Sequence, residues 1–73
     1  MAEMSDELKK LVGVATDMVL PVKVRTDTIK YIGDIGTREA LLALLELAAN
    51  DKLTRKEREQ ALDYARKIIK SEK

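Results

Sequence analysis

Acidic side chains are the residues of this sequence best suited to chemistry, because it contains no histidine and no cysteine. Histidine is the usual proton shuttle near neutral pH, and together with cysteine it supplies most ligands for zinc, copper and haem iron. Four carboxylates that could gather are those of Asp17, Asp27, Asp34 and Glu39. Their spacing matches no calcium-binding loop, and oxygen-only sites need tighter grouping. We therefore expect no metal site and no cofactor.

Catalysis by a carboxylate pair or a lysine would require a walled pocket, which a chain of 73 residues seldom builds alone. Gly33 and Gly36 precede an expected helix, as glycines do in phosphate-binding loops. No strand precedes them, and neither a third glycine nor a Lys-Ser/Thr pair follows. Both glycines are expected to serve a turn between helices. The sequence therefore predicts no enzyme and no small-molecule substrate.

Basic residues near the C-terminus form the second group that could bind a ligand. They are Lys52, Arg55, Lys56, Arg58, Arg66, Lys67 and Lys70. Together they could contact several phosphates of a nucleic acid. Glu57, Glu59 and Asp63 interleave with them at spacings that form pairs within a helix, such as Asp63 with Lys67. The net charge is only +1 and the aromatic residues are only two tyrosines, so nucleic-acid binding is the alternative function, not the favoured one.

Helices are the elements that must position all these side chains. Apolar residues recur at helical spacing almost throughout, and no stretch shows the alternation of a strand. The pattern predicts an all-α fold of four antiparallel helices, at about residues 5–19, 22–33, 37–50 and 55–70, which form two stacked hairpins in a single domain of residues 1–73. Ser5 and Thr37 are expected N-caps, and Thr54 with Glu57 forms a capping box.

The two halves of the sequence align without a gap when Leu8 is placed on Leu41. The further matched pairs are Leu11 with Leu44, Val12 with Leu45, Val14 with Leu47, Ala15 with Ala48, Leu20 with Leu53, Arg25 with Arg58, Ile29 with Leu62, Ile32 with Ala65 and Ile35 with Ile68. Any two amphipathic helices match at some offset. Here two consecutive helix pairs and the loops between them keep one register, so we interpret the pattern as an internal repeat.

One full repeat unit resembles a known family. The residues that carry the resemblance are Val24-Arg25, Ile29, Ile32-Gly33-Asp34-Ile35-Gly36, Ala40-Leu41, Leu44-Leu45-Glu46-Leu47 and Asp51. They are similar to the HEAT-type repeat, especially its short form in phycobilisome-lyase-like proteins, over about residues 22–51. The resemblance implies a fragment of an α-α superhelix that serves as a scaffold for other proteins. It also implies that Arg25 and Arg58 brace the stack through acidic or carbonyl groups, with Asp51 the nearest acidic candidate. Arg66 and Ile69 replace the turn glycines, so we expect the array to stop there.

The third expected helix is apolar nearly all round, and something must cover it. Leu41, Leu44, Leu45 and Ala48 form one stripe, with Leu42 and Ala49 on one flank and Leu47 on the other. Either neighbouring helices cover both flanks, or the Leu42 flank meets a partner. The expected core is listed as Leu11, Ala15, Ile29, Ile32, Leu41, Leu44, Leu45, Ala48, Leu62, Ala65 and Ile68.

Two repeat units are fewer than the three or more that stacked repeats generally need, so we expect a second copy to supply the missing neighbour. Candidate interface residues are Val14, Met18, Leu42, Leu45 and Ala49. The absence of cysteine and of a membrane-length apolar stretch predicts a cytoplasmic location. The sequence thus predicts a protein–protein interaction module without catalytic activity, acting as a homodimer.

Overall fold

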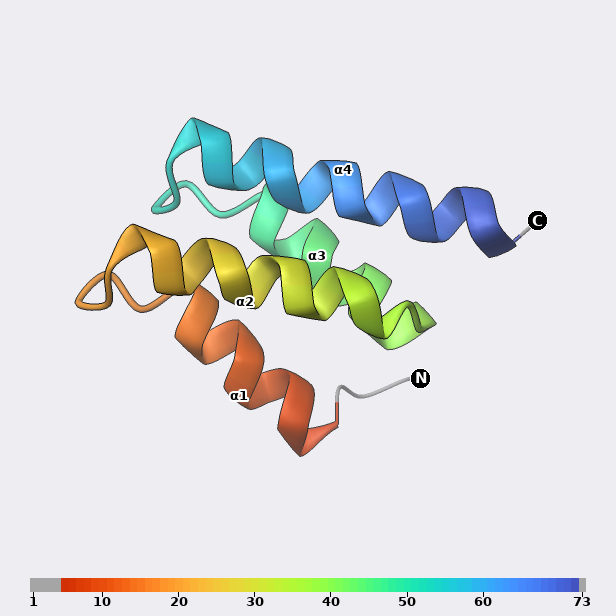
Figure 1. Cartoon of the computed structure of the whole chain (residues 1–73), viewed down its shortest axis with the longest axis horizontal. Coiled ribbons are helices and arrows are strands. Elements are labelled where there is room, and N and C mark those ends of the chain that lie inside the picture. The colour runs from red at the N-terminus through yellow and green to blue at the C-terminus, as the bar shows by residue number, and fades with distance from the viewer. Residues whose placement is uncertain (1–4, 73) are drawn as a thin grey trace.

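Four helices make up the regular structure of this computed structural model, which describes residues 5–72. They are α1 (Asp6–Ala15), α2 (Val22–Ile35), α3 (Arg38–Ala48) and α4 (Arg55–Glu72). No strand occurs within these residues, so the all-α prediction is confirmed. Successive helices reverse direction, which makes α1 with α2 and α3 with α4 two hairpins (Figure 1).

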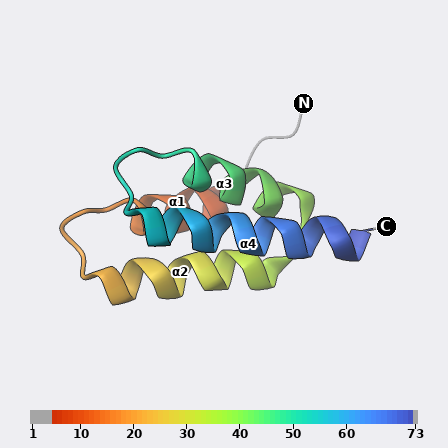
Figure 2. The same ribbon diagram turned by 90° about the horizontal axis from the view of Figure 1, so that it is seen from above.

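The helices α2 and α3 form the middle of the stack. Figure 2 looks down on α4 and shows α2 on one side of it and α3 on the other. On the opposite side of the stack, α1 contacts both α2 and α3, and it makes no contact with α4. The outer helices of the described part of the chain are therefore α1 and α4.

All four helices begin at or within one residue of the predicted starts, and three of them carry the predicted N-terminal caps. The Ser5 hydroxyl oxygen accepts a hydrogen bond from the amide of Leu8 at 3.2 Å, and that of Thr37 accepts one from Ala40 at 3.1 Å. Thr54 and Glu57 bond reciprocally. The Thr54 hydroxyl accepts from the Glu57 amide at 3.1 Å, and Glu57 Oε1 accepts from the Thr54 amide at 2.9 Å. These bonds satisfy amides that the first helical turn leaves unpaired.

The first helix ends at Ala15, whereas the sequence predicted residue 19. The Thr16 hydroxyl donates to the carbonyl of Val12 at 2.9 Å, and Asp17 Oδ1 accepts from the amide of Val19 at 3.0 Å. Threonine and aspartate side chains that bond to nearby backbone compete with helix formation. As a result, residues 16–20 form a turn, and Val19 projects from this turn and not from a helix face.

The second helix continues to Ile35, two residues beyond the predicted end. Gly36 ends it at a φ of 71°, a left-handed conformation that glycine adopts without a steric cost. Gly33 is helical, so its expected role in the turn is wrong. A Cβ at Gly33 would lie 2.6 Å from Cδ1 of Tyr64, so this glycine allows α4 to approach α2 closely.

Replacing Gly33 by alanine is expected to destabilise the fold by about 1 kcal/mol or more, because the overlap with Tyr64 outweighs the gain in helix propensity. Urea denaturation followed by circular dichroism measures the effect. In a Tyr64→Gly background, which removes the ring and also the Cβ that would lie 2.9 Å from the new methyl group, the same replacement is expected to stabilise, since only the propensity gain remains. Destabilisation of similar size in both backgrounds would contradict the close contact.

The core lies where all four helices meet. Its buried apolar residues are Leu8, Ala15, Ile29, Ile32, Ala40, Ala43, Leu44, Leu47, Leu53, Ala61, Ala65 and Ile68. Of the predicted core, Leu11, Leu41 and Ala48 are only partly buried against it. Leu45 and Leu62 are exposed, at 40% and 36%, so their assignment to the core is wrong. The last two helices also differ from their predicted ends, since α3 stops at Ala48 and α4 continues to Glu72.

Candidate protein-binding surface

One flank of α3 is apolar and uncovered. The opposite flank, with Ala40, Ala43 and Leu47, is completely or almost completely buried. Leu42 is 43% exposed and Leu45 is 40% exposed. At 100° per residue, Leu42, Leu45 and Ala49 lie within one narrow arc of the helix. The described helices thus leave one side of α3 open.

The helix α4 also carries two exposed apolar residues, on the flank away from α2. Towards α2, α4 presents Gln60, whose amide donates to the carbonyl of Thr26 at 3.1 Å, and Tyr64, which covers Gly33. Leu62 and Ile69 lie on the other flank of α4, and α3 is the other helix that α4 contacts. We name Leu42, Leu45, Ala49, Leu62 and Ile69 together the end face.

The structure brings three of the five predicted interface residues together on the end face, namely Leu42, Leu45 and Ala49. Val14 is partly buried on α1, and Met18 is exposed in the turn after α1. Because α1 makes no contact with α4, these two residues do not join the end face. The other two members were missed as interface residues, since Leu62 was predicted in the core and Ile69 was predicted at a position where a turn glycine is replaced.

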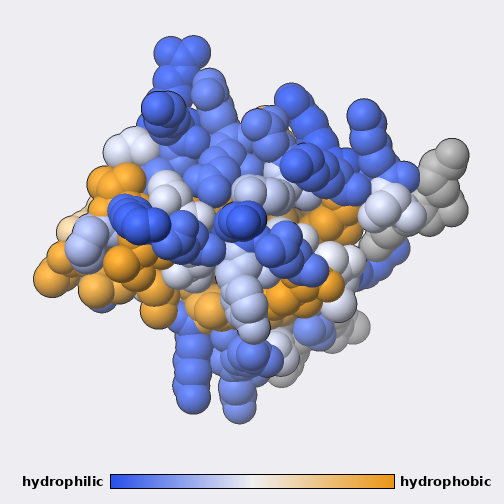
Figure 3. Space-filling model, viewed as in Figure 1, coloured by the Kyte–Doolittle hydropathy of each residue, from blue (hydrophilic) through white to orange (hydrophobic). Residues whose placement is uncertain are grey.

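A second exposed apolar group lies in the connection between α1 and α2 and in the first turn of α2. It comprises Met18, Val19, Val22 and Val24, and Val19 is the most exposed of them at 92%. Figure 3 shows apolar surface gathered at the end of the molecule where this connection lies. We name these four residues the apolar loop. A signal for it is the apolar run from Met18 to Val22, which the prediction of a longer first helix obscured.

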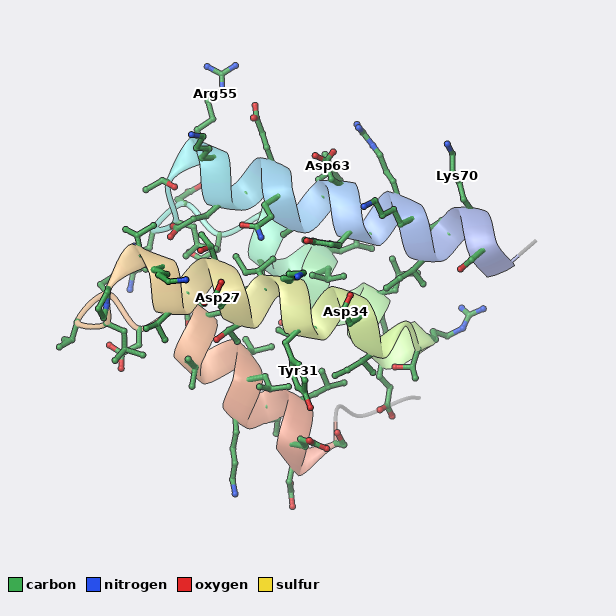
Figure 4. All side chains as sticks on the ribbon, viewed as in Figure 1. Asp27, Tyr31, Asp34, Arg55, Asp63 and Lys70 are labelled. Atoms are coloured by element: carbon green, nitrogen blue, oxygen red, sulfur yellow. The ribbon has the colours of Figure 1, made fainter. Side chains whose placement is uncertain are left out.

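The basic residues of α4 are largely paired. Arg55 bonds Glu59 at 3.3 Å, Asp63 lies 3.6 Å from Arg66, and Lys67 Nζ lies 5.2 Å from the centre of the Tyr64 ring. The predicted pair of Asp63 with Lys67 is therefore wrong. Figure 4 shows Arg55, Asp63 and Lys70 projecting from α4 away from the other helices. Lys52 is exposed in the loop before α4, and Lys56 and Lys70 are exposed on the helix itself.

Arg25 braces the stack, although not through Asp51. Its Nε donates to Glu57 Oε2 at 3.0 Å, and its Nη1 donates to the carbonyl of Leu20 at 2.7 Å. Both side chains of this ion pair are buried. Asp51 lies instead 3.8 Å from Arg58, on the surface. The guanidinium of Arg25 thus ties the start of α2 to the start of α4 and to the turn after α1.

A shallow hollow of about 260 Å³ runs along α2. Asp27, Lys30, Tyr31 and Asp34 line it, and all four belong to this one helix and are exposed. Figure 4 shows Tyr31 reaching from α2 towards α1. Asp27 is paired with Lys23 at 3.3 Å. Among residues 5–72, no three acidic side chains lie close enough together to hold a metal ion.

Comparison with known proteins adds no relative, since no family model, no curated protein and no solved structure matches the chain. The helices of the described residues include none that is both long and apolar enough to cross a membrane.

Proposed function

We propose that this chain is a cytoplasmic protein–protein interaction module without catalytic activity, which self-associates as a homodimer. The end face is the observation that carries this proposal. Leu42 and Leu45 are each about two-fifths exposed, while the opposite flank of the same helix is buried. Contiguous apolar residues left open in this way are typical of surfaces that bind another protein.

The size of the chain supports a second copy as the partner. A stable interface buries about 800 Å² per partner, and the described residues expose 5039 Å² in all, so a dimer would cover about one-sixth of that surface. Burial of apolar surface contributes about 25 cal/mol per Å² before the costs of association. For a core formed by only four helices, and with no cysteine to form a disulfide, this is a substantial gain.

We also propose that the four helices form HEAT-like repeat units. Two features support it. Helices α1 and α3 run in the same direction along the stack (Figure 1). Arg25 also joins two neighbouring helix starts, in agreement with the bracing role that the family resemblance implies.

Light scattering coupled to size exclusion, over a concentration series and at two salt concentrations, tests the self-association. The single chain has a mass of 8.2 kDa. We expect a mass near twice that value that changes little with salt, because apolar burial depends weakly on ionic strength. The mass of a single chain at every concentration would contradict the homodimer.

A small nucleic-acid-associated protein is the second candidate, and the outward direction of Arg55 and Lys70 favours it (Figure 4). Binding through such residues releases counterions, so the logarithm of the affinity falls linearly with the logarithm of the salt concentration. Titration of a labelled oligonucleotide at several salt concentrations separates this candidate from apolar contact. Absence of binding at low salt would exclude it.

A further inference from the structure

We propose, building on the self-association proposed above, that two copies pair end face to end face about a two-fold axis, and that the opposite end of the stack does not take part. The contact is then closed, because each copy uses the same surface and leaves no second one for a third copy. Three observations about the two ends of the stack carry this inference.

The end face points away from the rest of the molecule. On α1, Leu8 and Ala15 are buried against α2 and α3, the two helices that α1 contacts. Their repeat equivalents, Leu41 and Ala48, stand at the same angular positions on α3, which runs in the same direction (Figure 1). Leu41 and Ala48 therefore face away from α1, and they are only partly buried. Helix α3 covers one side of α1, but no helix of residues 5–72 covers the equivalent side of α3 in the same way.

The opposite end of the stack carries charges where α3 carries alanines. The flank of α3 opposite the end face presents Ala40 and Ala43, both fully buried. Their repeat equivalents, at the same places on α1, are Glu7 and Lys10, and both are exposed. In a head-to-tail stack, Glu7 and Lys10 of one copy would press against the end face of the next. Removing such charges from water onto an apolar surface is costly.

Pairing of two end faces avoids that cost. Leu42, Leu45 and Ala49 of one copy then meet apolar residues of the other, and Glu7 and Lys10 stay in water. The outermost residues of α4, such as Asp63 and Lys70, project away from the stack and also remain hydrated (Figure 4). A symmetric pair is therefore favoured over a growing array.

The inference is tested with single charged substitutions in the full chain. Leu45→Glu is expected to weaken dimerisation roughly 100-fold or more, because each interface would bury two carboxylates. The helical circular dichroism and the cooperative melt are expected to remain, since Leu45 is already exposed in the single chain. Leu42→Glu, at a more outward position, is the second variant if Leu45→Glu fails to fold. The matched control is Val19→Glu in the apolar loop, which is expected to remain a dimer.

A mixing experiment distinguishes the two-fold pair from a head-to-tail contact. In this experiment, labelled Leu45→Glu chain is mixed with unlabelled wild type. In a head-to-tail contact, the unaltered α1 end of the variant would bind the end face of the wild type with unchanged affinity. The two-fold pair predicts that this affinity is weakened, because the mixed dimer buries one carboxylate. The wild-type mass is also expected to stop near that of two chains, and continued growth with concentration would overturn the closed pair.

The outcomes separate the failure of this inference from failure of the proposed function. A dimer that survives Leu45→Glu and Leu42→Glu but is lost in Val19→Glu would overturn the end-face pairing and leave the self-association intact. A wild-type chain that is monomeric throughout would overturn both.

Discussion

Replacement of Glu57 by alanine is expected to lower the free energy of unfolding by about 3–5 kcal/mol, enough to abolish a cooperative melt in a domain of this size. The Glu57 side chain is 1% exposed, and it accepts hydrogen bonds from Arg25 Nε and from the amide of Thr54. Its removal leaves the buried guanidinium of Arg25 without a charge partner and also removes one half of the cap of α4. Thermal denaturation followed by circular dichroism measures the loss.

The control for this variant is Glu59→Ala on the same helix. Glu59 also pairs with an arginine, Arg55, at 3.3 Å, but both side chains are largely exposed. Exposed pairs of this kind contribute at most about 1 kcal/mol, so this variant is expected to melt close to the wild-type temperature. Equal losses in the two variants would show that burial of the Arg25 pair is not what makes Glu57 important.

The second large effect is expected when the side chain of Leu44 on α3 is shortened to that of alanine. Leu44 is completely buried, and Leu44→Ala is expected to cost about 2–5 kcal/mol through lost contacts and the cavity left behind. Leu45→Ala, one residue along, removes the same atoms from an exposed position and is expected to cost about 1 kcal/mol or less in the single chain. Urea unfolding of both variants, at several protein concentrations, measures the difference.

Protein concentration also separates the two roles of these leucines. The effect of Leu45→Ala is expected to grow with concentration, because the dimer adds stability in proportion to its population. The effect of Leu44→Ala is expected to be large even in the most dilute samples, where no dimer forms. Comparable losses for both leucines in dilute solution would contradict the orientation of α3.

Features set by neighbouring residues could be predicted from the sequence. The caps at Ser5, Thr37 and Thr54 depend on side chains close in sequence to the amides they bond, and all three form. The early end of α1 is also local in origin, at Thr16 and Asp17. It was missed because the helical apolar pattern continues to Val19 and outweighed these two residues.

Features set by neighbours distant in the sequence could not be predicted from the same pattern. The helix α3 is apolar on both flanks, so periodicity alone did not decide that Leu47 is buried and Leu45 exposed. That choice depends on where α1 and α4 lie. In the same way, Glu57 was predicted as a capping residue and as a partner of cations in its own helix, and its buried pair with Arg25 was missed because Arg25 is 32 residues away. The close approach of helices that Gly33 allows depends on Tyr64, which is also remote in sequence.

The double role of Glu57 has a consequence for how the chain opens. The carboxylate that caps α4 also holds Arg25, and Arg25 in turn holds the carbonyl of Leu20. Helix ends usually fray in small local fluctuations. The first turn of α4 cannot fray in this way without also releasing the buried guanidinium of Arg25 at the start of α2. The amide protons at the start of α2 and the start of α4 should thus exchange with solvent through one shared opening event, whereas those of the last turns of α4, beyond the last core residue Ile68, exchange independently.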